Sequence, residues 1–86
     1  MTLYFRNSHG EMRMIAEFES GMTDKEYMEA TEKEIKKFCD ARNFKIYYTR
    51  VWHTEHNGQQ MTKFDVGSHT EFFYLDQIIN LKGCMV

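Results

Sequence analysis

The stretch from residue 44 to residue 75 constrains the fold most, because it carries two tight-turn signals between β-strand patterns. Asn57-Gly58 is typical of a type I′ hairpin turn, and Gly67-Ser68 is typical of a type II′ turn. Alternating apolar and polar residues on either side of both turns indicate half-buried strands. The sequence therefore predicts three antiparallel strands, over residues 44–56, 59–66 and 69–75.

Two-residue turns fix which residues face each other across the strands, and therefore which side chains share a face. The first turn pairs Trp52 with Lys63, and the second places Phe72 beside Lys63 as well. By the same rule Arg50 faces Asp65, which favours an ion pair between the strands. One face of the predicted sheet then carries an aromatic and basic cluster that consists of Trp52, Lys63, Phe72, Tyr74, Arg50 and Met61.

The opposite face of this sheet is expected to receive a helix, because no cation lies among its apolar residues. These residues are Val51, Phe64, Val66, Phe73 and Leu75. The aromatic face has two interpretations: it binds a partner, or an N-terminal hairpin covers it and its rings belong to the core. Strict alternation also places Phe44, Ile46 and Tyr48 on the aromatic side, unless a bulge near residues 48–49 reverses the strand.

The remaining elements complete an α+β fold. Thr23 and Glu26 match a capping box, and apolar side chains recur at helical spacing, so a helix is predicted over residues 23–42. Residues 2–6 and 11–19 alternate as a first hairpin, and residues 78–81 favour a short final strand over a single helical turn. We expect one small domain over residues 1–86, in which one helix packs on one face of an antiparallel sheet. The element order is β-β-α-β-β-β plus a short terminal element.

Composition and charge limit which partners and which cellular location are expected. The chain has 86 residues and a formal charge of −2, so its overall field does not attract nucleic acid. It contains no apolar stretch of about 18 residues and no basic, apolar leader, so no membrane partner and a cytoplasmic location are expected. Cys39 and Cys84 lack metal-binding or redox spacing and are expected to be thiols.

No pattern in the sequence predicts catalysis. His53 and His56 resemble a metal-binding pair, but residues three apart on a strand point to opposite faces. Cys39 falls on the apolar side of the helix, where a thiol is a core residue rather than a nucleophile. Gly58 and Gly67 lie in hairpins and not in a phosphate-binding loop. We therefore expect no enzyme, no catalytic residue, no metal and no cofactor.

Two functional classes remain. The preferred hypothesis is a small protein-binding module, an inhibitor or accessory protein of phage or mobile-element type that blocks host machinery by binding it. The alternative is a single-strand nucleic-acid binder whose aromatic rings stack bases while Lys63, Arg50 and Lys45 contact phosphates. The acidic net charge counts against the alternative. A homodimer formed through an exposed strand edge is also considered, because no proline blunts the edges.

Overall fold

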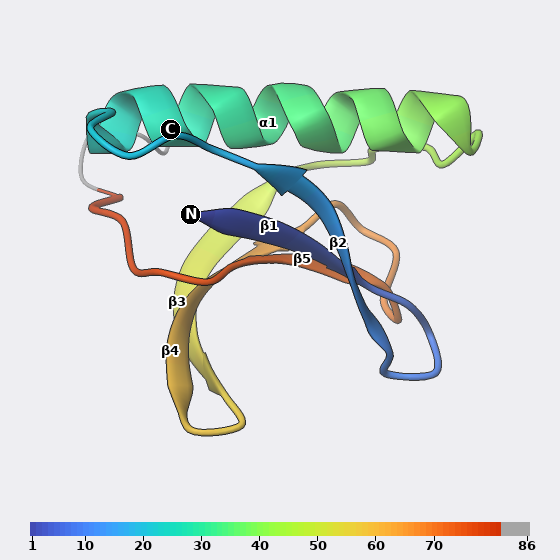
Figure 1. Ribbon diagram of the computed structural model, residues 1–86. Helices are drawn as coiled ribbons and strands as arrows, with labels where there is room; N and C mark the ends of the chain where they lie inside the picture. The colour runs from blue at the N-terminus through green and yellow to red at the C-terminus, as the bar shows by residue number, and fades with distance from the viewer. Residues whose placement is uncertain (82–86) are drawn as a thin grey trace.

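A five-stranded antiparallel sheet with one helix on one face makes up the computed structural model, which describes residues 1–81 (Figure 1). The elements in chain order are β1 (Thr2–Arg6), β2 (Met12–Glu17), α1 (Asp24–Ala41), β3 (Arg50–His56), β4 (Gln59–Asp65) and β5 (Phe72–Leu75). The strand order across the sheet is β2-β1-β5-β4-β3. The predicted α+β class and element order are confirmed. Cys84 lies outside the described residues.

The N-terminal hairpin extends the sheet and does not cover its aromatic face. β1 pairs with β2 on one side and with β5 on the other, so the first hairpin lies in the same layer as the rest of the sheet. Figure 1 shows α1 on one side of this layer, with the β3–β4 hairpin and the β1–β2 loop both extending away from the helix. The second interpretation of the aromatic face, burial beneath the hairpin, is therefore wrong.

The first predicted turn is confirmed and the second is wrong. β3 and β4 pair in the predicted register, and Asn57 and Gly58 both have the positive φ angles of a type I′ turn, 52° and 83°. β4 and β5 instead pair Lys63 with Tyr74, two residues away from the predicted pairing with Phe72. Because side chains alternate with a period of two, a shift of two residues leaves every side chain on its predicted face.

A longer loop replaces the second two-residue turn. The carboxylate of Asp65 accepts a hydrogen bond of 2.8 Å from the backbone N–H of Gly67. Gly67 and His69 both have positive φ angles, 97° and 71°, so the chain bends at two separate residues. An aspartate that binds the backbone two residues ahead forms its own turn, and this local bond competes with the β-ladder.

The predicted strand before residue 50 and the predicted strand after residue 76 are also wrong. Residues 43–49 run from the end of α1 back to the sheet, and one backbone hydrogen bond, from Tyr47 N–H to the Val66 carbonyl at 3.1 Å, connects them to it. Residues 76–81 form neither strand nor helix. They are held by side chains instead: the Thr62 hydroxyl donates to the Gln77 carbonyl at 2.8 Å. This segment covers the helix-facing side of the β3–β4 hairpin, where Ile79 is buried.

The core lies between α1 and the face of the sheet that was predicted to receive it. Its buried members come from every strand except β2, from the helix, from the residue that follows β4 and from the terminal segment: Leu3, Phe5, Tyr27, Met28, Ile35, Cys39, Val51, Phe64, Val66, Phe73, Leu75 and Ile79. Burial raises the pKa of the Cys39 thiol, and the carboxylates of Asp40 and Glu71 raise it further. A thiol held neutral in this way is a poor nucleophile, as a core position implies.

A bulge in β2 changes which of its side chains reach the core. The pairing of β1 with β2 shifts between Leu3 and Tyr4, so that Ile15 has no direct partner. Ile15 and Ala16 both pack against the core, whereas Met14 on the other side of the sheet is 56% exposed. The strict alternation expected over residues 11–19 therefore does not hold beyond Met14.

The capping box at the start of α1 makes the helix sensitive to acid. The Thr23 backbone N–H donates to the Glu26 carboxylate at 2.9 Å, and the Glu26 N–H donates to the Thr23 hydroxyl at 3.1 Å. The bond from the Thr23 backbone, and secondarily the interaction with its side chain, lowers the pKa of Glu26 below its ordinary value of 4.5. A lowered pKa in the folded state means that ionised Glu26 stabilises the fold at pH values above about 4.5. This contribution is lost as the pH falls through the lowered pKa.

We therefore expect Glu26→Gln to melt below the parent protein at neutral pH and to approach it in acid, where both side chains are neutral. Thermal melts followed by circular dichroism between neutral pH and a pH well below 4.5 measure this difference. Glu29→Gln, beyond the first turn of α1, is the matched control, because the helix dipole acts mainly at the first turn. A melting difference for Glu26→Gln that stays constant with pH would show that the charge of the cap does not matter.

Candidate functional site

The sheet face opposite α1 carries the predicted aromatic and basic cluster, and we call it the open face. It is formed by Trp52, Lys63, Phe72, Tyr74, Arg50 and Met61 from β3 to β5, together with Tyr4, Arg6, Met12 and Met14 from β1 and β2. Within residues 1–81 no helix or second sheet lies over this side (Figure 1). All six residues predicted from the sequence therefore lie on one continuous surface of the sheet.

Lys63 is the centre of the open face. Its ammonium nitrogen lies 3.9 Å from the ring centroid of Phe72, 5.4 Å from that of Trp52 and 5.6 Å from that of Tyr74. The register produces this arrangement, because Lys63 stands directly between Trp52 on β3 and Tyr74 on β5. Three aromatic rings around one ammonium stabilise its position through cation–π attraction.

The six predicted residues differ in how far they reach the surface. Trp52, Lys63 and Phe72 are half-buried, and Arg50 is exposed. Tyr74 and Met61 are only 4% and 5% exposed, so they form the floor of the open face rather than its contact surface. The ring of His56, 5.2 Å from that of Tyr74, contributes to this burial.

Four further residues of the open face were not identified from the sequence. Tyr4 pairs with Tyr74 and with Met14, and Arg6 pairs with Phe72 and with Met12. The alternation in residues 2–6 shows that Tyr4 and Arg6 share a face. It contains no signal that β1 pairs with β5, so the sequence pattern could not place these residues beside the predicted cluster.

The cations of the open face have no carboxylate partner. Arg50 lies opposite Asp65, as predicted, but the two form no ion pair, since the Asp65 carboxylate is buried and accepts the Gly67 N–H. The Arg50 guanidinium lies 5.5 Å from the ring centroid of Tyr48. Across residues 1–81 the one ion pair within 4.0 Å joins Lys36 and Asp40 on α1. Arg50, Lys63 and Arg6 are therefore available to a negatively charged ligand.

His53 and His56, the pair that resembled metal ligands, are separated by the sheet. His53 lies on the helix-facing side, where its Nε2 is 2.7 Å from the Ile79 carbonyl oxygen, and His56 lies on the open face beside Tyr74. The two imidazoles thus occupy opposite faces, as their spacing predicts. Among the residues that the structure describes, no group of three or more histidine, cysteine or acidic side chains could hold a metal ion.

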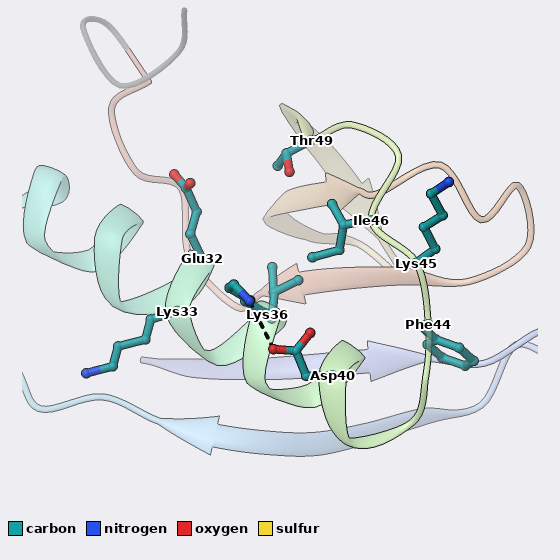
Figure 2. A pocket seen from close by; sticks show the side chains of 9 residues that line it. Glu32, Lys33, Lys36, Asp40, Phe44, Lys45, Ile46 and Thr49 are labelled. Carbon is teal, nitrogen blue, oxygen red and sulfur yellow. Dashed lines mark hydrogen bonds and ion pairs between the residues drawn. The ribbon is translucent and has the colours of Figure 1, made fainter.

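A separate open groove of about 700 Å³ lies between α1 and residues 44–49. It is lined by Glu32, Lys33, Ile35, Lys36, Asp40, Phe44, Lys45, Ile46 and Thr49. Figure 2 shows Lys33 and Lys45 extending outward at opposite ends of the groove, while Lys36 and Asp40 form their ion pair of 3.0 Å. The groove combines charges of both signs on exposed side chains.

Comparisons of this chain with protein-family models, with curated proteins and with solved structures found no match. Within residues 1–81, no helix is both long and apolar enough to span a membrane. The function of this chain is therefore inferred from the open face, the surface on which aromatic, methionine and basic side chains gather.

Proposed function

We propose that this protein is a small non-enzymatic protein-binding module, an inhibitor or accessory protein of the kind that phages and mobile elements use to block host machinery. The open face is the binding surface. The observation that carries the proposal is a sheet face without a covering layer on which half-buried Trp52 and Phe72 flank the unpaired Lys63. Aromatic residues, methionine and arginine are the residue types that are enriched at protein interfaces.

The composition of the open face supports binding rather than a purely structural role. A helix already covers the opposite face, and the largest fully buried rings, Phe64 and Phe73, belong to that side. Met14, by contrast, is among the most exposed apolar side chains that the structure describes. Methionine adapts its shape to a contacting surface, and burial of apolar area stabilises a complex by roughly 25 cal/mol per Å².

The nucleic-acid alternative requires the same rings to stack bases. In this structure the ammonium of Lys63 lies 3.9 Å from the Phe72 ring centroid, so a base would have to displace it from the ring face. A formal charge of −2 also provides no general attraction for phosphates. Titration with a single-stranded oligonucleotide at increasing salt separates the two classes, because phosphate contacts give affinity a steep salt dependence.

We expect Trp52→Ala to weaken partner binding by at least about 2 kcal/mol, roughly 30-fold in Kd, because aromatic anchors dominate interface energetics. The partner is first identified by affinity capture from a host lysate with mass spectrometry, and its affinity for each variant is then measured by calorimetry. The fold should largely survive the substitution, since Trp52 is only half-buried.

Tyr47→Ala is the matched control for this experiment. Tyr47 is an aromatic residue that is 66% exposed, but it lies in the segment between α1 and β3, outside the open face. Its removal should leave the affinity unchanged. A captured partner that bound Trp52→Ala as tightly as the parent protein would move the binding surface away from the open face.

A further inference from the structure

The charges of the open face indicate what kind of partner it fits, and this inference rests on the proposed function. Arg6 on β1, Lys63 on β4 and Arg50 on β3 bring three cations to the end of the face nearest Phe72. Two carboxylates of the face bind the backbone: Asp65 accepts from the Gly67 N–H, and Asp76 accepts from the Thr2 N–H at 3.0 Å. A third, Glu17, lies at the opposite end of the face, where it pairs with Thr2. The basic side chains are thus left without a partner on a protein whose net charge is negative.

The aromatic rings determine where a negative group would bind. The three rings around Lys63 hold its ammonium by the π faces, and the Lys63 side chain is half-buried. Cation–π contact leaves the donor hydrogens of the ammonium able to reach a carboxylate, and a pair of this kind is stronger where water is partly excluded. The rings provide apolar surface directly beside it.

We propose that the partner of this protein presents an acidic segment to the open face, with carboxylates on Lys63, Arg50 and Arg6 and an apolar side chain against Trp52. Complementary charge fixes the orientation of such a complex and raises its association rate. Glu17, the exposed acid of β2, pairs with Thr2 at the end of the face away from the three cations. Its negative charge repels an acidic segment and so favours binding at the end that carries the cations.

The chain carries a natural reporter for this surface, because Trp52 is the single tryptophan of the sequence. The experiment titrates the full chain with a synthetic peptide of glutamate, leucine and phenylalanine, and follows Trp52 emission and amide NMR shifts. A peptide with every glutamate replaced by glutamine and an oligothymidylate of similar length are titrated in parallel. We expect the acidic peptide to bind at the open face at least roughly tenfold more tightly than its glutamine analogue, and to weaken as salt rises.

Lys63→Met removes the charge and keeps most of the side-chain volume, and it should lower affinity for the acidic peptide by roughly tenfold. Lys45→Met is the matched control, because Lys45 also lies over an aromatic ring, 4.9 Å from the centroid of Tyr47, but outside the open face. Its affinity should equal that of the parent. NMR spectra of the free variants establish that both are folded.

Three results would contradict the proposal that the partner is acidic. Equal binding of the glutamine peptide at the open face would leave the proposed function intact but remove the role of charge. Tighter binding of the oligothymidylate at the same residues would make a nucleic acid the occupant. If no peptide shifted Trp52 and a captured partner were also insensitive to Trp52→Ala, both the acidic segment and the binding role of the face would be rejected.

Discussion

Phe64→Ala is expected to lower the free energy of unfolding by about 3–5 kcal/mol, because it removes a fully buried ring and leaves a cavity between β4 and α1. A domain of this size has a total stability of about 5–15 kcal/mol, so the variant would be largely destabilised. Urea denaturation followed by circular dichroism gives the difference directly. In a thermal melt each kcal/mol corresponds to a fall of about 4–8 °C.

The loss of stability in Trp52→Ala is the comparison that shows whether the open face differs from the core. Trp52 stands opposite Lys63, the residue that precedes Phe64, but its ring lies on the open face and is half-buried. A ring that remains partly in water contributes less to stability than one that is sealed in the core, so the loss should be clearly smaller than for Phe64→Ala. Equal losses would mean that both faces of the sheet are core, and the open face would not be a binding surface.

The faces of the sheet could be predicted from the sequence because they depend on a period of two. Asn57-Gly58 set the register of β3 and β4 correctly, and the pairing predicted across Gly67-Ser68 then assigned Phe72 and Tyr74 to the open face. The error at the second turn did not alter this assignment, because Lys63 pairs with Tyr74 instead of Phe72, a shift of two residues. A shift of one residue would have reversed it.

The parts that the sequence did not predict depend on contacts between distant segments. Nothing in residues 2–6 indicates that β1 pairs with β5 some 70 residues later, so Tyr4 and Arg6 were not placed on the open face. Residues 44–49 have strong β propensity, but the structure places them as a link between helix and sheet, connected by one ladder-like bond at Tyr47. A high β propensity means that a side chain suits the surface of a sheet. A segment with such side chains forms a strand only where a neighbouring strand is present.

The prediction for the terminal segment, residues 76–81, failed for the same reason, because its structure depends on contacts with a distant strand. Ile78 and Ile79 suggested a strand, but residues 76–81 bind the hairpin through the Thr62 hydroxyl and not through a β-ladder. The Thr62 hydroxyl donates to the Gln77 carbonyl and accepts from the Ile79 N–H at 3.3 Å, so it satisfies two backbone groups without a partner strand. A single threonine with this role has no distinguishing pattern in the sequence.

Gly67→Val is expected to destabilise the protein by about 2–5 kcal/mol, through two effects at one residue. The φ angle of 97° is one that side-chain-bearing residues rarely adopt, and left-handed backbone costs such a residue roughly 1–2 kcal/mol. A Cβ at this position would also lie 3.0 Å from the Tyr47 Cβ and 3.2 Å from the Tyr48 Cε2, and overpacking adds roughly 1–3 kcal/mol. The loop that ends β4 therefore needs glycine for both space and conformation.

Gly58→Val separates the two effects, because Gly58 has a similar φ of 83° but no atom within 4 Å of an added Cβ. It should lose only the conformational part, and Gln59→Val, on the exposed residue that follows, should change stability by no more than about 0.5 kcal/mol. Urea denaturation of the three variants should thus give the order Gly67→Val, Gly58→Val, Gln59→Val from the largest loss to the smallest. Equal losses at the two glycines would show that Tyr47 and Tyr48 do not pack against the loop, and the link between residues 44–49 and the sheet would then be looser than the structure describes.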